Sequence, residues 1–175
     1  MKKNFINKIG VLGGTFDPAH TGHLKISIEA KKKYKLKKII WAITKRNPFK
    51  NKSHLDLKKR IKLAKKISLK NKFIKVRFFE SKIKSNKTVD LISHLKKKGK
   101  STEIYFIMGA DNLINFHKWH RWNEIASKSI LLVFNRGKYK TKSLKSITYK
   151  KYNNLRLKFI NFKKINISSS KLRNI

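Results

Sequence analysis

The chain has 175 residues, 39% of them hydrophobic, which suits a single domain over residues 1–175 with one core. Its 47 Lys and Arg outnumber 8 Asp and Glu, and the formal net charge of +39 points first to a polyanion partner. The absence of cysteine excludes disulfides, thiolate metal sites and cysteine nucleophiles, and the absence of a long apolar run predicts a cytoplasmic protein with no signal peptide and no membrane partner.

Short β-rich runs alternate with helical patterns along the chain. In chain order the expected elements are strand 8–12, helix 23–33, strand 38–43, helix 55–68, strand 73–79, helix 88–97, strand 103–108, short helices 111–116 and 122–128, strand 129–134, strand 156–162, and a helix that begins near Ser169. Residues 138–152 lack a clear pattern and are expected to be a loop or a frayed edge. This alternation predicts an α/β, Rossmann-like fold, with a mostly parallel sheet flanked by helices and a ligand site at the carboxyl ends of the strands.

A glycine-rich run directly follows the first predicted strand. Gly13 and Gly14 allow a sharp turn and a close approach to a ligand, with backbone N–H groups that can meet phosphate oxygens. Thr15 and Phe16 continue the run. Paired glycines usually mark only a turn, so this feature by itself is a weak signal.

Two histidines stand where the next helix is expected to begin. His20 and His23 are three residues apart, a spacing that turns both imidazoles toward one side. The positive end of the helix favours an anion beside them, and a neutral imidazole can donate one hydrogen bond to a phosphate oxygen. No third ligand at a suitable spacing accompanies the pair, so we expect no metal site built from protein side chains here.

A second anion-binding pattern lies in the run I-S-S-S-K-L-R, at 167–173. Serine hydroxyls and N–H groups at a helix start can cradle phosphate, with Arg173 one turn further on. We therefore expect Ser169, Ser170 and Arg173 to bind phosphate groups. On its own a serine run is more often a helix cap or a tail.

These motifs together resemble the G-G-T-F-D-P-x-H-x-G-H and I-S-S-T-x-[IL]-R signatures of adenylyltransferases in the nucleotidylyltransferase superfamily. The runs F-I-M-G-A-D-N-L at 106–113 and F-H-K-W at 116–119 are similar to the block typical of bacterial nicotinate-nucleotide adenylyltransferases, which pantetheine-phosphate adenylyltransferases lack. N-P-F-K at 47–50 and T-V-D at 88–90 also fall where that family has N-P-[LF]-K and T-x-D. The chain departs from the pattern in having Ser170 for Thr and in ending two residues after Arg173.

The resemblance implies a nucleotidyltransferase that joins AMP from ATP to nicotinate mononucleotide, releasing pyrophosphate, with Mg²⁺ bound mainly through the ATP phosphates. It implies catalytic contacts from His20 and His23 and ATP contacts from Gly13, Gly14, Thr15, Phe16, Ser169, Ser170 and Arg173. It implies acceptor contacts from Asn47, Lys50, Thr88, Gly109, Asp111, Trp119 and His120. In this reading Trp119 stacks on the pyridine ring and Asp111 accepts from a ribose hydroxyl, although Trp119 and Trp122 could instead be core residues.

Other readings stay open. Nicotinamide mononucleotide or phosphopantetheine could be the acceptor of a related adenylyltransferase. A basic nucleic-acid-binding module would explain the charge but neither signature. The charge is nearly all lysine, spread along the chain among the Asn and Ile that A/T-rich codons also encode, so genome composition explains it better than a nucleic-acid partner does. The sequence is silent on oligomeric state and leaves a homo-oligomer open.

Overall fold

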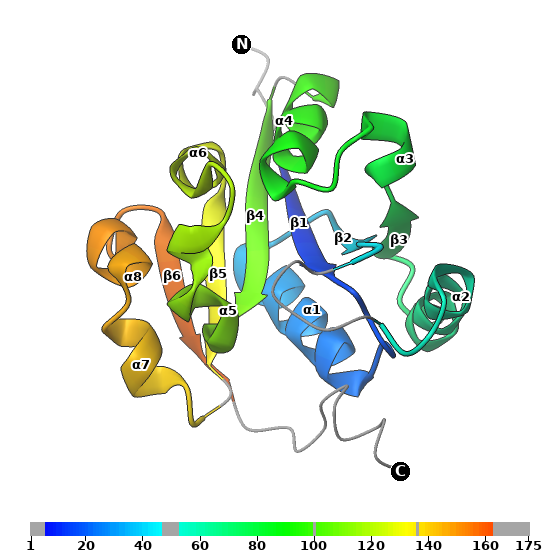
Figure 1. Cartoon of the computed structure of the whole chain (residues 1–175), viewed down its shortest axis with the longest axis horizontal. Helices are drawn as coiled ribbons and strands as arrows, with labels where there is room; N and C mark the ends of the chain where they lie inside the picture. Colours follow the sequence, from blue (N-terminus) through cyan, green and yellow to red (C-terminus); the bar gives the residue numbers. More distant parts are fainter. Residues whose placement is uncertain (1–5, 47–52, 100, 136, 163–175) are drawn as a thin grey trace.

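The computed structural model describes residues 6–46, 53–99, 101–135 and 137–162. Within them six strands form one parallel sheet in the order β3-β2-β1-β4-β5-β6 (Figure 1). The strands are β1 (Asn7–Gly14), β2 (Lys38–Ile43), β3 (Ile74–Phe78), β4 (Thr102–Gly109), β5 (Ile130–Asn135) and β6 (Leu157–Asn161). Every expected strand is confirmed. The four inner strands are mostly continuous apolar runs, as is typical of buried parallel strands, whereas the edge strands β3 and β6 alternate apolar and polar residues.

Helices connect the strands. They are α1 (Thr21–Tyr34), α2 (Leu57–Ser68), α3 (Glu80–Ile83), α4 (Thr88–Lys98), α5 (Ala110–Ile114), the 3₁₀ helix η1 (Phe116–Lys118), α6 (Trp122–Lys128), α7 (Lys140–Leu144) and α8 (Ile147–Tyr152). The single helix expected over 111–116 is divided between α5 and η1, and the helix expected near Ser169 lies outside the described residues.

The expectation of a loop at 138–152 is wrong, because that segment forms α7 and α8. Both helices are short and rich in lysine, so they carry little apolar periodicity. They are held by contacts that the local pattern does not reveal. The Ser146 side chain caps α8 by accepting from the Tyr149 N–H, and the rings of Tyr149 and Tyr152 pack against the core.

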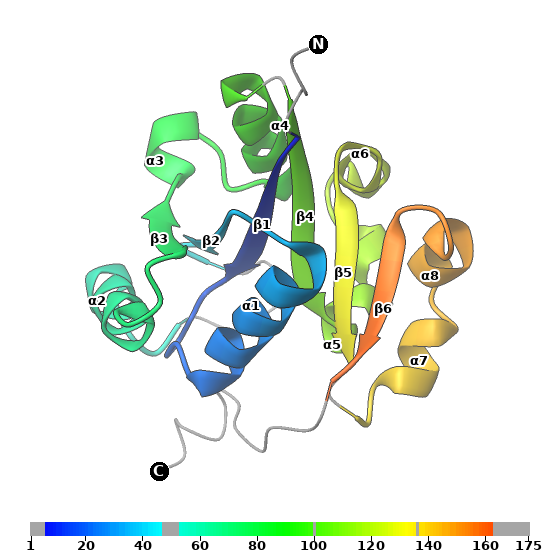
Figure 2. The same cartoon turned by 180° about the vertical axis from the view of Figure 1, so that it is seen from behind.

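The sheet has a core on each face. One face packs α4, α5 and α6 against alternate residues of the strands, including Val11, Phe106 and Met108. The other packs α1 and α2 against the intervening residues, including Trp41 and Ile107. Figures 1 and 2 show the two helix layers from opposite sides. The expected α/β arrangement is therefore confirmed.

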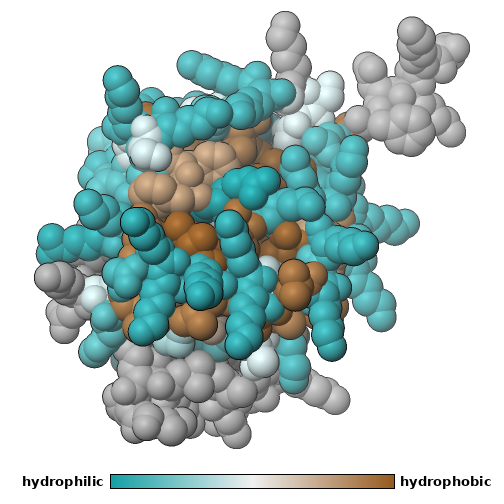
Figure 3. Space-filling view, turned by 90° about the vertical axis from the view of Figure 1, so that its right-hand side faces the viewer, coloured by the Kyte–Doolittle hydropathy of each residue, from teal (hydrophilic) through white to brown (hydrophobic). Residues whose placement is uncertain are grey.

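The edge strand β3 carries exposed charged side chains. Along the edge strand β3, Ile74 and Val76 are buried while Lys75 and Arg77 between and after them are exposed. Hydrophilic side chains stand over apolar surface on the side of the molecule that carries α2, β3 and α3 (Figure 3). Such charges discourage edge-to-edge pairing with another sheet. Among the described helices, none is both long enough and apolar enough to cross a membrane.

The strand order creates a switch point between β1 and β4. The chain builds the sheet outward from β1 through β2 to β3, then returns to add β4 on the other side of β1. In sheets of this kind the crevice for a ligand opens beyond the carboxyl ends of the strands at that point. β1 ends there at Gly14 and β4 ends at Gly109.

Candidate active site

The connection from β1 to α1 forms one wall of the site. Phe16 adopts a φ of 49°, and its ring is 2% exposed. That ring stacks on Trp41 of β2 with centroids 5.1 Å apart and lies 4.7 Å from the His23 ring. Phe16 therefore points into the core, where its ring packs on Trp41 and holds the loop against β2.

The two histidines cap the helix reciprocally. His20 is the N-cap residue of α1, and its Nδ1 accepts from the Gly22 N–H at 3.0 Å. The Nδ1 of His23 in turn accepts from the His20 N–H at 3.2 Å, and the two ring centroids are 3.9 Å apart. Because both Nδ1 atoms accept hydrogen bonds, each neutral imidazole carries its proton on Nε2. The expected pair of imidazoles on one side is confirmed, because the two rings lie together at the start of α1.

α1 is fixed to the sheet directly beneath the histidines. The Ser27 hydroxyl donates to the His23 carbonyl at 2.8 Å and accepts from Trp41 Nε1 at 2.8 Å. Ser27 and Trp41 are both fully buried. This chain of hydrogen bonds ties the first turn of α1 to β2, so the imidazoles sit on a rigid helix start.

Asp17 braces the loop. Its carboxylate is buried and accepts the N–H groups of His54 at 2.7 Å and Leu55 at 3.0 Å. These donors belong to the segment that leads into α2. The sequence favours a bracing role for Asp17 over metal binding, and these two hydrogen bonds agree with that prediction.

Sequence reasoning missed Arg60. This residue of α2 is 2% exposed, and its guanidinium donates to the carbonyls of Thr15, Thr44, Lys45 and Leu55. An Arg among the many basic residues of a helix carries no signal of burial. Its partners are main-chain carbonyls, which leave no trace in the sequence.

The described residues expected on the acceptor side are carried by the end of β4, the starts of α4 and α5, and the turn between η1 and α6. Gly109 ends β4, and half-buried Asp111 lies in the first turn of α5. Thr88 is the first residue of α4. The Trp119 ring lies against Phe106 at 6.1 Å and Phe116 at 5.2 Å, so it packs on the core while staying only partly buried.

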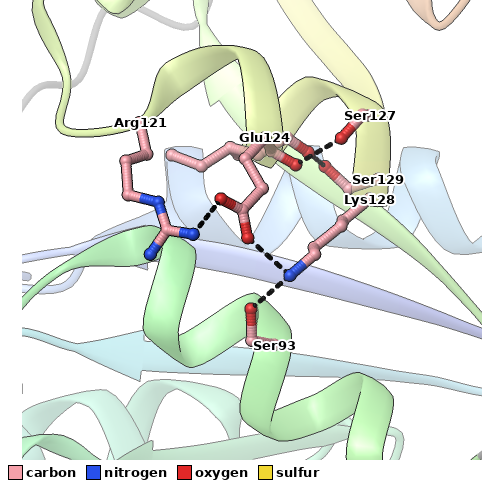
Figure 4. Close-up of polar contacts among 7 residues, drawn as sticks. Ser93, Arg121, Glu124, Ser127, Lys128 and Ser129 are labelled. Atoms are coloured by element: carbon pink, nitrogen blue, oxygen red, sulfur yellow. Dashed lines mark hydrogen bonds and ion pairs between the residues drawn. The ribbon is translucent and has the colours of Figure 1, made fainter.

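The turn after Trp119 is held by charged groups. His120 is exposed, and Arg121 adopts a left-handed backbone with φ 50° before α6 begins. Figure 4 shows Glu124 between Arg121 and Lys128. The hydrogen bond from Lys128, aided by the charges of Arg121 and Lys128, holds the pKa of the Glu124 carboxyl below its ordinary value.

The same cluster connects two helices. Lys128 Nζ also donates to the Ser93 hydroxyl of α4 at 2.9 Å (Figure 4). α6 and α4 are thus held together next to the turn that carries Trp119 and His120. Trp122 packs its ring edge-on against Phe116 and Tyr152, which supports its reading as a core residue.

Comparison with known proteins agrees with this geometry. Residues 11–175 match the family model described as cytidylyltransferase-like. A protein of Pelagibacter ubique (strain HTCC1062), named as a probable nicotinate-nucleotide adenylyltransferase, is 68% identical over 168 residues, which cover 96% of this chain and 93% of that protein. The chain belongs to the nicotinate-nucleotide adenylyltransferase family.

Solved structures support the fold of this family member. A Plasmodium falciparum nicotinic acid mononucleotide adenylyltransferase complexed with NaAD has a TM-score of 0.74 at 19% identity, covering 96% of this chain and 83% of that chain. The same enzyme complexed with APC has a TM-score of 0.74 at 20% identity, with the same coverage. At these identities the likeness bears on the fold.

The structure describes only some of the expected site residues of this family member. The described ones lie at the ends of β1 and β4, in the loop after β1, at the starts of α1, α4 and α5, and in the turn between η1 and α6: Gly13, Gly14, Thr15, Phe16, His20, His23, Thr88, Gly109, Asp111, Trp119 and His120. Asn47, Lys50, Ser169, Ser170 and Arg173 lie outside the described residues. Among the residues that are described, no three His, Asp or Glu side chains gather in a way that could hold a metal ion.

Proposed function

We propose that this protein transfers AMP from ATP to nicotinate mononucleotide, forming deamido-NAD and pyrophosphate in NAD biosynthesis. The observation that carries the proposal is the reciprocally capped pair of His20 and His23 beside the glycine loop at the switch point of the sheet. The 68% identical relative named for this activity supports it. The match of the family model to residues 11–175 supports the further proposal that the chain works as one nucleotidyltransferase domain, and a cytoplasmic location stays a prediction.

The reaction requires alignment of the acceptor phosphate with the α-phosphorus of ATP more than it requires acid or base catalysis. An oxygen of the acceptor phosphate attacks the α-phosphorus of ATP, a new P–O bond forms, and the bond to the β-phosphate oxygen breaks to release pyrophosphate. The attacking phosphate is already ionised near neutral pH, so no general base is required. The rate acceleration then comes from positioning of the two substrates and from stabilisation of charge on the phosphoryl oxygens.

The ATP side of the site follows from the first loop. The Nε2–H groups of His20 and His23 donate to phosphate oxygens, and the start of the 14-residue helix α1 adds positive potential. The nucleotide lies along the loop from Gly13 to Phe16. In this proposal Ser169, Ser170 and Arg173 bind the β- and γ-phosphates.

Magnesium fits this site as a companion of ATP. Mg²⁺ would be held mainly by the ATP phosphates and would neutralise part of their negative charge. The nearest carboxylate in the loop, Asp17, already accepts two backbone N–H groups, so the ATP phosphates are the main ligands available.

On the acceptor side we assign the pyridine ring to Trp119 and its carboxylate to Thr88 and the backbone around His120. Asp111 accepts from a ribose hydroxyl at the end of β4. Gly109 leaves room for the ligand to approach, and Asn47 and Lys50 complete the acceptor contacts.

The test follows pyrophosphate release with ATP, Mg²⁺ and one of three acceptors: nicotinate mononucleotide, nicotinamide mononucleotide or phosphopantetheine. We expect preferential turnover of nicotinate mononucleotide, reduced about 10²- to 10³-fold in kcat by His20→Ala or His23→Ala. His94→Gln is the matched control, since His94 lies on α4 with its ring 6.0 Å from Phe79. Turnover with another acceptor alone would overturn the Trp119 and Thr88 assignments, and turnover with none would overturn the proposed function.

A further inference from the structure

Arg60 joins three separate segments of the chain at the carboxyl edge of the sheet. The guanidinium is a planar fork of five N–H donors, suited to holding several acceptors at fixed angles. Its hydrogen bonds run from Nη1 to the Thr15 carbonyl at 2.6 Å and the Thr44 carbonyl at 2.8 Å, from Nη2 to the Lys45 carbonyl at 3.0 Å, and from Nε to the Leu55 carbonyl at 3.1 Å. All four acceptors belong to the main chain.

The segments held by Arg60 belong to opposite sides of the site. Thr15 lies in the loop that leads from β1 to His20, on the side assigned to ATP. Thr44 and Lys45 directly follow β2 and lead toward Asn47 and Lys50, on the side assigned to the acceptor. One buried cation therefore connects the backbone of the ATP side to the backbone of the acceptor side.

Carboxylates hold the same segments through their N–H groups. Asp17 accepts from the His54 and Leu55 N–H groups at 2.7 and 3.0 Å. Glu80 accepts from the Lys45 N–H at 3.0 Å and from the Thr44 hydroxyl. Two of the segments whose carbonyls Arg60 holds, at 44–45 and at 54–55, are thus also held by carboxylates.

Charge is concentrated around Arg60 in a way that suits a fixed cation. Burial lowers the pKa of its guanidinium, and the charges of Asp17, Asp56 and Glu80 oppose that shift. These are three of only 8 acidic residues in the chain. A buried charge with several hydrogen bonds and nearby counter-charges is costly to move, which makes the connection rigid.

We propose that Arg60 is a positioning residue for adenylyl transfer, which sets the distance between the α-phosphorus of ATP and the attacking phosphate by holding the Thr15 carbonyl together with those of Thr44 and Lys45. The proposal rests on the proposed function. Arg60 touches neither substrate in this account. Its loss should therefore impair the alignment of the two substrates more than the binding of either one, and a misplacement of about 1 Å can cost about 10²-fold in rate.

The test compares Arg60→Lys with the wild type and with Arg77→Lys, a matched control on the exposed face of β3. Lysine keeps the charge, but its single ammonium group cannot reproduce the fork. Titration calorimetry measures the affinity and stoichiometry of ATP and of nicotinate mononucleotide separately, and a single-turnover assay measures the rate per bound ATP. We expect affinities within about threefold of wild type and a rate about 10²-fold lower.

The outcomes separate the proposals. A lower ATP stoichiometry with an unchanged rate per bound ATP would mean that Arg60 only supports folding, and would overturn the inference. If Arg60→Lys does not fold, Glu80→Gln replaces it. This substitution removes the negative charge of half-buried Glu80 and so weakens the hydrogen bond that its carboxylate accepts from the Lys45 N–H. An unchanged rate per bound ATP in that variant would also overturn it. Failure of the wild type to use nicotinate mononucleotide would instead contradict the proposed function.

Discussion

In the proposed reaction His20 combines two roles in one ring. Its Nδ1 caps α1 by accepting from the Gly22 N–H, and this bond leaves the proton of the neutral ring on Nε2. The cap therefore fixes the proton on the nitrogen that we propose contacts a phosphate oxygen. The sequence motif predicted a phosphate contact for His20, but the capping role and the tautomer depend on backbone geometry that the sequence does not display.

The two roles can be separated by His20→Asn. Asparagine is a good N-cap residue, so we expect the free energy of unfolding to stay within about 0.5 kcal/mol of wild type, whereas His20→Ala should lose about 1 kcal/mol. Both variants lack the Nε2–H group, and kcat should fall about 10²- to 10³-fold in each. Urea unfolding and pyrophosphate release provide the measurements. Full activity of His20→Asn would show that the imidazole acts only as a cap.

At the scale of elements, the strands were the most predictable part of this protein. The inner strands are mostly continuous apolar runs and the edge strands β3 and β6 are short β-rich runs with alternating polar residues, so each of the six is visible in the sequence. Three of the short helices are less predictable. The sequence does not indicate α3, and it favours a loop where α7 and α8 form, because helices of 4 to 6 residues are stabilised by tertiary packing and capping more than by a pattern of their own.

One buried hydroxyl supplies a hydrogen bond between α1 and β2, beside the apolar packing of the same helix. In Ser27→Ala the indole N–H of fully buried Trp41 loses its 2.8 Å partner, and an unsatisfied buried donor costs about 1 to 3 kcal/mol. Ser68→Ala is the control, since the Ser68 hydroxyl donates within its own helix to the Ala64 carbonyl. We expect urea unfolding to show a clearly larger loss for Ser27→Ala. Equal losses would contradict a linking role for Ser27.

At the scale of the whole molecule, the large positive net charge should affect the stability of the folded state. The net charge is +39, and the described residues contain three ion pairs, two of which involve Glu124. Lysines at such density repel one another in the folded state. The interaction is long-ranged at low ionic strength and is screened by salt.

Salt should therefore stabilise this protein. The Debye length falls from about 30 Å at about 0.01 M salt to about 8 Å at about 0.15 M, so most of the rise in Tm should occur below about 0.15 M NaCl. Thermal unfolding monitored by circular dichroism at fixed pH provides the measurement, with an uncharged osmolyte as the control. A Tm that rises only at molar salt would indicate surface exclusion of the salt, and a constant Tm would contradict net repulsion.

The sequence by itself determined the strands, the long helices, the parallel α/β class and the family, since these depend on local apolar runs and on contiguous motifs such as the one from Gly13 to His23. Tertiary structure alone decided the strand order, the reciprocal caps and the place of Arg60. The Arg60 contacts join residues 45 and 16 positions away in the chain, at Thr15 and Thr44. Their acceptors are backbone carbonyls, which every residue possesses, so only folding could determine which of them Arg60 would meet.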